Sequence, residues 1–253
     1  MLGTTDNDYK TPNLEPTLND AEIDFLLETL EPYLEKKVDK SLIKSGFGGL
    51  RPLIMAEDRT NTKSILRDHE VETDPKTGLI SLLGGKWTTY RVMAQDTIDH
   101  ASEILRGSKG VCKTEDCILV GGVDFVPNGY QSLIKTYNLP EDVARHLNQK
   151  YGSRASKVAD LIEANSELSE KLTAQYAYIK AEVVYCTQTE MACSVRDFVA
   201  RRTRLELMDW QAALAITPEV SRLMGDVLGW SNEKTAHEAT VYSTLIQQFK
   251  ALN

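Results

Sequence analysis

The sequence predicts an α+β fold in two parts, with short strands and helices in the first part and an all-α helical bundle in the second. Three observations support this division. The uncharged apolar run Gly78–Leu83 is typical of a buried strand, and the apolar steps of three and four over residues 90–105 indicate an amphipathic helix. From Tyr130 onward, strand patterns fade and helical periodicity dominates.

Gly84, Gly85 and Lys86 lie on the turn between this strand and this helix. Such a turn offers backbone N–H groups, the positive end of a helix dipole and close approach of glycine backbone, so it is a candidate anion site. A Walker-type phosphate loop is excluded, because Ile80 stands where that pattern needs a glycine and Trp87 where it needs Ser or Thr. Taken alone, the triplet favours an ordinary glycine turn with a surface lysine.

A first helix is expected after Asn19, which is placed to cap it with Glu22 in the capping-box position. Pro32 is expected to kink this helix. Its buried face is predicted to consist of Ile23, Leu26, Leu27, Leu30 and Leu34.

Two arginines of the first part have local patterns that orient them. Arg51 precedes Pro52 and is therefore held extended, after glycines that suggest backbone passing close to a ligand or to another strand. Arg67 lies on a predicted strand, Ile65–Val71, which is followed by a hairpin turn over 75–78. His69 is expected on the same strand face as Arg67. Without further information, both arginines are as well explained by solvation or ion pairing.

The second part is predicted to contain seven helices, separated by Pro140, Gly152, Pro218 and Gly229. Arg201, Arg202 and Arg204 spread over more than one helix face, which favours ion pairs with neighbouring acids over a phosphate site. Tyr176, Tyr178 and Tyr185 are expected to be core or interface aromatics. The predicted helices are Glu141–Lys150, Arg154–Asn165, Ile179–Glu190, Ser194–Met208, Trp210–Ile216, Glu219–Leu228 and Asn232–Leu252.

The composition excludes several classes of partner. The net charge of −8 argues against a nucleic-acid partner, which needs a basic face, and gives no support to docking on anionic lipid. No apolar run approaches the length of a membrane span. Neither zinc spacing nor an EF-hand loop occurs, so no metal is expected. The cysteines are Cys112, Cys117, Cys186 and Cys193; they form no Cys-x-x-Cys pair, which favours reduced thiols.

The run from Gly84 to Arg91, Gly-Gly-Lys-Trp-Thr-Thr-Tyr-Arg, resembles a late signature of FAD-dependent glycerol-3-phosphate dehydrogenase, especially of the mitochondrial form. Other stretches follow in that family's order, so the resemblance covers nearly all of the 253 residues. They are Leu2–Asp6, Ser45–Leu53 with extra residues ahead of the arginine, Ser64–His69 and Ala200–Leu205.

The resemblance implies oxidation of sn-glycerol 3-phosphate to dihydroxyacetone phosphate, with FAD as cofactor and quinone as electron acceptor. A phosphate dianion calls for charge-assisted contacts, for which Arg51, Arg67 and Lys86 are the candidates. The helix that begins near Trp87 is expected to direct its positive end at the flavin. The residues implied at the cofactor are Gly84, Gly85, Lys86, Thr88 and Thr89; no residue is assigned as the catalytic base.

A Rossmann-type FAD site also needs a Gly-x-Gly-x-x-Gly turn, and this chain has none. The chain is therefore expected to be a C-terminal fragment that binds little FAD alone. Residues 1–108 are predicted to be the C-terminal part of a D-amino-acid-oxidase-like FAD and substrate domain, 109–129 a linker and 130–253 the all-α domain. Without the N-terminal FAD-binding domain as its partner, the first part is expected to expose apolar surface.

The resemblance further implies a mitochondrial location, peripheral attachment to the inner membrane and a possible homodimer. Two alternatives stay open. The chain is a fragment of a soluble glycerophosphate oxidase that passes electrons to oxygen, or it is a flavin-free helical interaction module.

Overall fold

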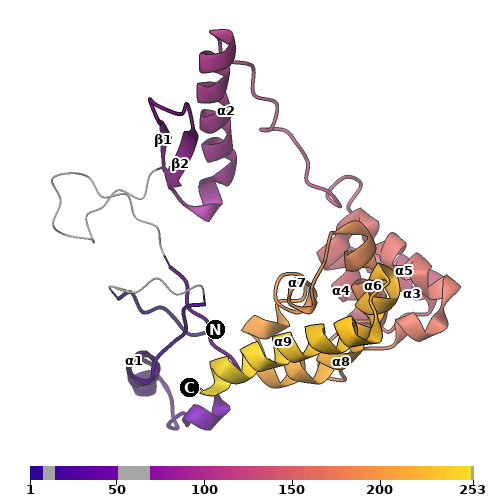
Figure 1. Cartoon of the computed structure of the whole chain (residues 1–253). Coiled ribbons are helices and arrows are strands. Elements are labelled where there is room, and N and C mark those ends of the chain that lie inside the picture. The colour runs from indigo at the N-terminus through magenta and orange to yellow at the C-terminus, as the bar shows by residue number, and fades with distance from the viewer. Residues whose placement is uncertain (8–14, 51–68, 252–253) are drawn as a thin grey trace. The chain divides into compact units, whose positions relative to one another are not determined.

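In the computed structural model of the chain, residues 1–7, 15–50 and 69–251 are described. The contacts divide the chain into two units (Figure 1). The helical unit comprises residues 1–49 and 120–253, and the hairpin–helix unit comprises residues 50–119.

The hairpin–helix unit contains a two-stranded antiparallel sheet in its described part. Strand β1 (His69–Thr73) pairs with β2 (Ile80–Gly84), with His69 opposite Gly84. The predicted hairpin turn is confirmed, and Asp74 stabilises it because its Oδ1 accepts hydrogen bonds from the backbone N–H groups of Lys76 and Thr77.

A long helix, α2 (Tyr90–Arg106), packs against this hairpin after a short 3-10 turn, η4 (Trp87–Thr89). Two polar contacts join β1 to the helix. His69 Nε2 lies 2.8 Å from Asp96 Oδ2, and Thr73 Oγ1 lies 2.7 Å from His100 Nε2. The helix ends at Gly107, whose φ of 73° is the left-handed conformation that glycine adopts at little cost.

The prediction that the strand after Gly78 is buried is wrong. Leu79, Leu82 and Leu83 are 64%, 39% and 37% exposed, and none of the described residues of this unit is buried. The physical reason is that a single helix on a sheet of two strands is too small to bury either face fully, so Leu82 and Leu83, which point to opposite faces, both stay exposed. The prediction of exposed apolar surface in this half is thereby confirmed. The predicted strand over 65–71 is seen only from His69 onward, since residues 51–68 lie outside the described part.

The all-α second part is confirmed by the helical unit, whose helices enclose a core that includes Val143, Phe198 and Ile246. Helix α8 packs against α6, α7 and α9. The helices are α3 (Tyr130–Tyr137), α4 (Glu141–Tyr151), α5 (Ala155–Ala164), α6 (Lys180–Thr189), α7 (Val195–Val199), α8 (Trp210–Leu228) and α9 (Asn232–Ala251), with 3-10 turns η5 (Gly152–Arg154), η6 (Ser166–Ser169) and η7 (Leu205–Leu207).

Three helices differ from the prediction. Helix α3 has no counterpart among the predicted helices. Helix α8 continues through Pro218, because buried neighbours such as Ile216 and Val220 hold both halves in one packed segment. Helix α7 is much shorter than predicted, because the chain leaves the helix and Arg204 takes a left-handed φ of 58°.

The predicted ion pairing is confirmed for two of the three arginines in this region. Arg201 pairs with Asp197 at 3.1 Å, and Arg202 donates to the Asp197 carbonyl at 3.0 Å and lies 3.7 Å from Glu190. Arg204 is exposed, and no partner for it is found in the described part of the chain. Tyr178 and Tyr185 are core residues as predicted.

The first helix, α1 (Asp20–Leu30), has the predicted capping box between Asn19 and Glu22. Pro32 ends the helix in a 3-10 turn, η1 (Glu31–Tyr33), and a second turn, η2 (Lys40–Leu42), follows. Only part of the predicted buried face is correct. Ile23 is buried, whereas Leu34 lies beyond the helix end and is 41% exposed.

Within the helical unit, the segment after η2 contacts η7 and the start of α8. Trp210 N donates to Lys44 O at 3.0 Å, and Ser45 Oγ donates to Leu207 O at 2.8 Å. A Cβ at Gly46 would lie 2.8 Å from Leu18 Cδ1, and a Cβ at Gly48 would lie 2.7 Å from the Pro16 carbonyl oxygen. These glycines therefore allow two parts of the N-terminal segment to approach each other closely.

A buried carboxylate connects α4 to α6. Glu182 is fully buried, and its Oε1 accepts hydrogen bonds from His146 at 2.9 Å, Tyr151 at 2.9 Å and Lys150 at 3.3 Å. Its Oε2 accepts from the backbone N–H of Ile179 at 2.9 Å. Burial opposes ionisation, but the hydrogen bond from His146 and the charge of Lys150 outweigh it and hold the pKa of Glu182 below its usual value.

We expect Glu182→Gln to destabilise the helical unit by about 1–3 kcal/mol, because a glutamine carbonyl cannot replace the charge-assisted hydrogen bonds that this buried carboxylate accepts from His146 and from the partly exposed Lys150. Chemical denaturation measures the loss. Glu141→Gln is the matched control, since the Glu141–Arg145 pair on the same helix α4 is largely exposed and contributes less than about 1 kcal/mol. Equal losses in the two variants would contradict the role of Glu182.

The second prediction concerns the stability of the helical unit at acid pH and rests on Glu219. The hydrogen bond from Arg222, with help from Lys180, lowers its pKa from 4.5 to about 2. Because the folded-state pKa is depressed, the stabilisation is complete above the unfolded value and is lost as the pH falls towards about 2. The difference in unfolding free energy between the wild type and Glu219→Gln should therefore be constant near neutral pH and shrink below about pH 4.5. A difference that does not change with pH would exclude this linkage.

Candidate functional site

The candidate site is the turn that joins β2 to α2. Gly84 and Gly85 have positive φ angles of 66° and 83°. A Cβ on Gly85 would lie 2.5 Å from Met93 Cε and 3.2 Å from His69 Cβ. The left-handed backbone conformation therefore favours glycine at this position, and His69 leaves little room for a β-carbon, whereas the flexible end of Met93 can move aside.

Lys86 follows in extended conformation and leads into η4. Thr89 donates both its backbone N–H and its hydroxyl to the Lys86 carbonyl, each at 3.0 Å. Neither N-cap residue, Lys86 for η4 or Thr89 for α2, makes a capping hydrogen bond with its side chain, and the first turn of α2 contains no acidic residue. The positive end of the helix dipole is thus left without a negative partner from the turn itself, which suits an anion.

The structure brings together five of the predicted site residues in this one turn: Gly84, Gly85, Lys86, Thr88 and Thr89. Lys86 and Thr88 are exposed, and no ion pair of Lys86 is found among the described residues. Arg51 and Arg67 lie outside the described residues, so their predicted place beside Lys86 stays a prediction. His69, a weaker candidate, points at α2 and pairs with Asp96.

Arg91, at the end of the glycine–lysine string, has a role that the sequence analysis missed. Its guanidinium donates to Gln95 at 3.1 Å, to Thr114 at 3.4 Å and to Cys112 Sγ at 3.9 Å. It therefore ties the first turn of α2 to the segment that follows the helix. The i, i+4 spacing of Arg91 and Gln95 was the only sequence signal for this arrangement.

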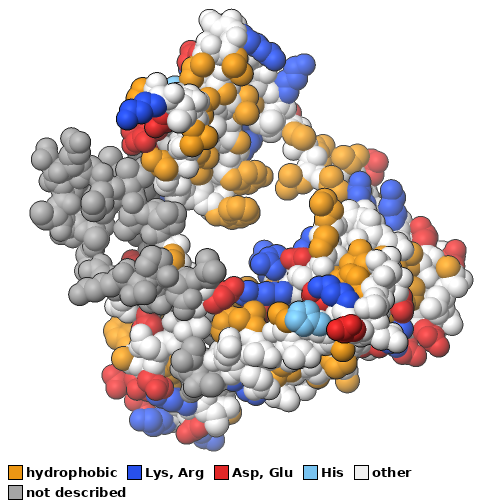
Figure 2. Space-filling view, in the orientation of Figure 1, with side chains coloured by type: hydrophobic (Ala, Val, Ile, Leu, Met, Phe, Trp, Pro, Cys, Tyr) orange, Lys and Arg blue, Asp and Glu red, His pale blue; other side chains and the backbone are white. Residues whose placement is uncertain are grey.

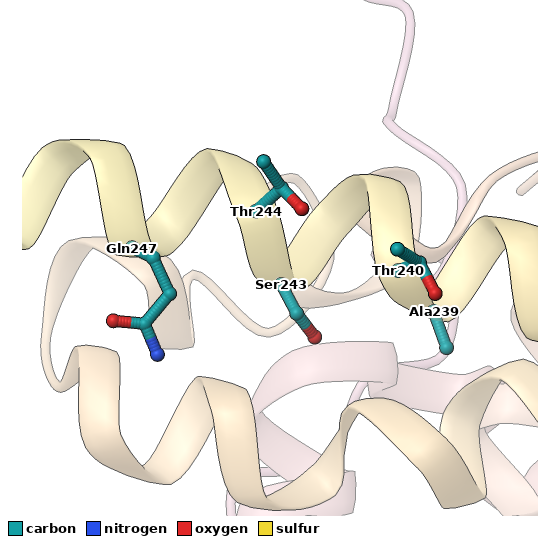
Figure 3. Close-up of a pocket in the computed structure, with 5 residues that line it drawn as sticks. All are labelled: Ala239, Thr240, Ser243, Thr244 and Gln247. Atoms are coloured by element: carbon teal, nitrogen blue, oxygen red, sulfur yellow. The ribbon is translucent and has the colours of Figure 1, made fainter.

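The helical unit has a hollow on its surface. It has a volume of about 370 Å³ and is lined by residues of α9 alone (Figure 3). No charged side chain lines it, so it offers nothing to hold a phosphate or to move a proton. The lining residues are Ala239, Thr240, Ser243, Thr244 and Gln247.

Within the described residues, no group of His, Cys, Asp and Glu side chains is arranged to hold a metal ion. In the same part of the chain, no helix combines the length and the apolar character that crossing a bilayer requires.

Residues 112–235 match the domain family described as the C-terminal domain of alpha-glycerophosphate oxidase. The chain is 36% identical over 249 residues to a probable mitochondrial glycerol-3-phosphate dehydrogenase of Dictyostelium discoideum, covering 94% of this chain and 38% of that protein. It is 38% identical to the Caenorhabditis elegans counterpart, covering 92% of this chain and 33% of that protein. The chain thus spans about a third of the length of these curated relatives.

The comparison of folds agrees with the comparison of sequences. The crystal structure of the glycerol-3-phosphate dehydrogenase of Bacillus halodurans, complexed with FAD, matches with a TM-score of 0.76 and 25% identity. The match covers 97% of this chain and 48% of that one. By sequence and by fold, the chain is therefore a relative of the FAD-dependent glycerol-3-phosphate dehydrogenases and matches their C-terminal region.

Proposed function

We propose that this chain acts as the C-terminal part of an enzyme that oxidises sn-glycerol 3-phosphate to dihydroxyacetone phosphate with FAD and passes the electrons to quinone. The observation that carries the proposal is the turn Gly84–Arg91. It resembles the family's signature, its backbone conformation favours glycine at Gly85, and the first turn of the helix that follows contains no acidic residue.

The turn suits an anionic cofactor or substrate because of the hydrogen-bond donors that it presents. Gly84 and Gly85 leave the backbone open to close approach, and the uncapped start of α2 favours negative charge. In this proposal Gly84, Gly85, Lys86, Thr88 and Thr89 hold the flavin, which supplies the hydride acceptor when bound. The chain's own residues position it and provide positive charge.

The substrate phosphate is assigned to Lys86 together with Arg51 and Arg67. Lys86 is exposed beside the helix N-terminus, so its amine and the helix dipole attract the same anion. Arginine forks bind phosphate oxygens in pairs and would fix the orientation of the substrate. No residue of this chain is assigned as the base that removes the hydroxyl proton.

The exposed apolar surface of the hairpin–helix unit supports a need for further polypeptide. Figure 2 shows hydrophobic side chains over this unit, at the top of the view. Surfaces of this kind are covered in stable assemblies. We assign the cover to the N-terminal FAD-binding domain. The exposed residues are Leu79, Leu82, Leu83, Trp87, Tyr90, Val92, Ile98, Ile104, Leu105, Val111, Ile118 and Leu119.

The finer expectations belong to the same proposal. Three of them rest on the resemblance: the domain limits at 1–108, 109–129 and 130–253, the homodimer, and the peripheral attachment to the mitochondrial inner membrane. The relatives named above are mitochondrial by name. The soluble oxidase is the second candidate, favoured by the description of the matching domain family. Peroxide formation in air during turnover distinguishes it from the quinone-dependent enzyme.

The proposal is tested by adding FAD to the 253-residue chain, alone and with a polypeptide that corresponds to the remaining length of a relative. We expect flavin absorbance to be retained on the protein only in the mixture, and to bleach on addition of glycerol 3-phosphate. Lys86→Ala should lower kcat/KM by about ten- to a hundredfold, the cost of one charge-assisted hydrogen bond.

Lys76→Ala is the control for this experiment, because Lys76 is an exposed lysine in the turn between β1 and β2. It should leave kcat/KM unchanged. If flavin binds neither to the chain alone nor to the mixture, the enzyme proposal fails and the helical interaction module becomes the better explanation.

The shape of the turn gives a further prediction. Gly85→Ala should destabilise the hairpin–helix unit by more than Gly78→Ala. Both changes force alanine into the left-handed region at a cost of about 1–2 kcal/mol, but only at Gly85 does the new Cβ also crowd His69 Cβ, at 3.2 Å, and displace the end of the Met93 side chain. Amide hydrogen exchange of β1 and β2 measures both losses. Equal protection in the two variants would show that contact with α2 does not restrict this position.

A further inference from the structure

The hairpin–helix unit contains a cavity that the proposed function does not use. It lies between α2 and the segment after that helix and has a volume of about 630 Å³. Two of the chain's four cysteines, Cys112 and Cys117, line it together with Arg91 and Thr114. The cavity therefore combines two thiols with a permanent positive charge.

The surroundings of Cys112 activate its thiol. The sulfur lies 3.1 Å from Thr114 Oγ1 and accepts a long hydrogen bond from Arg91 at 3.9 Å. The side-chain and backbone hydrogen bonds of Thr114, with the charge of Arg91, lower the pKa of Cys112 and outweigh desolvation and the negative charge of Asp99, which raise it. The thiolate is the nucleophilic form of cysteine, so this side chain is the more reactive of the two by its contacts.

Cys117 lies five residues further along the chain and lines the same cavity. Its backbone N–H donates to the carbonyl of Thr114 at 3.4 Å, and Thr114 is also the residue whose hydroxyl contacts Cys112. Cys117 is exposed and Cys112 is half-buried, so both can be reached from solvent. Residues 108–119 form no helix or strand, and the backbone there has few hydrogen bonds that would resist the approach of one sulfur to the other.

We propose that Cys112 and Cys117 are a peroxide-sensitive thiol pair that closes reversibly to a disulfide at this cavity. The Cys112 thiolate attacks one oxygen of a hydroperoxide, which breaks the O–O bond, gives a sulfenic acid and, after protonation, releases water or an alcohol. The Cys117 thiol then attacks that sulfur, which forms the S–S bond and expels water. Cys112 and Cys117 are together oxidised by two electrons, and an added dithiol reverses the reaction.

The test uses the reduced 253-residue chain and substoichiometric hydrogen peroxide, followed by alkylation, trypsin digestion and mass spectrometry. The pair should appear as a cross-link between peptides 110–113 and 114–135 that disappears after treatment with dithiothreitol. Cys112, although half-buried, should be oxidised several-fold faster than the exposed Cys193. Cys186 should stay reduced, because burial raises its pKa to about 12.

Two further measurements separate the proposal from general oxidation. In Cys117→Ser, the sulfenic acid of Cys112 should accumulate and react with dimedone. In strong urea, the advantage of Cys112 over Cys193 should vanish, because it depends on folded contacts with Arg91 and Thr114. Oxidation of Cys112 no faster than Cys193, or without the cross-link, overturns the proposal. None of these measurements depends on flavin or on dehydrogenase activity.

Discussion

The ionised carboxylate of Glu182 is the constraint on which the helical unit depends. A charge without exposure to water is tolerated only when nearly every oxygen lone pair is used, and here donors from α4 and from the start of α6 supply the partners. The apolar core forms around this contact, with Val143 and Leu147 on α4 and Val183 on α6. The contact therefore sets the relative position of two helices that apolar packing alone would leave free to slide.

The hairpin–helix unit is stabilised differently. It has no buried residue in its described part, and polar contacts such as His69–Asp96 and Thr73–His100 hold the sheet to the helix. A unit of this kind has little hydrophobic stabilisation of its own. The turn to which we assign the cofactor thus lies in a unit with little stabilisation of its own, which is why we also assign that unit a covering polypeptide.

Much of the fold could be predicted from local patterns. The capping box at Asn19, the turn at Asp74, the glycine–lysine turn and most of the helices follow from side chains that act within a few residues. Long-range effects could not be predicted in this way. Pro218 was expected to break α8, but packing of both halves keeps the helix continuous. Leu79, Leu82 and Leu83 were expected to be buried, but the described part of the chain leaves each of them more than a third exposed.

The sequence by itself determined the family resemblance, the helical second half and the location of the candidate anion site, because glycine, lysine and helix periodicity express their preferences locally. Only the tertiary structure decided which side chains meet. Glu182 with Lys150, Arg91 with Cys112 and Ser45 with Leu207 are separated along the chain by stretches that no periodicity relates. Such contacts are selected by the packing of whole elements, since only packing brings distant residues within hydrogen-bonding distance.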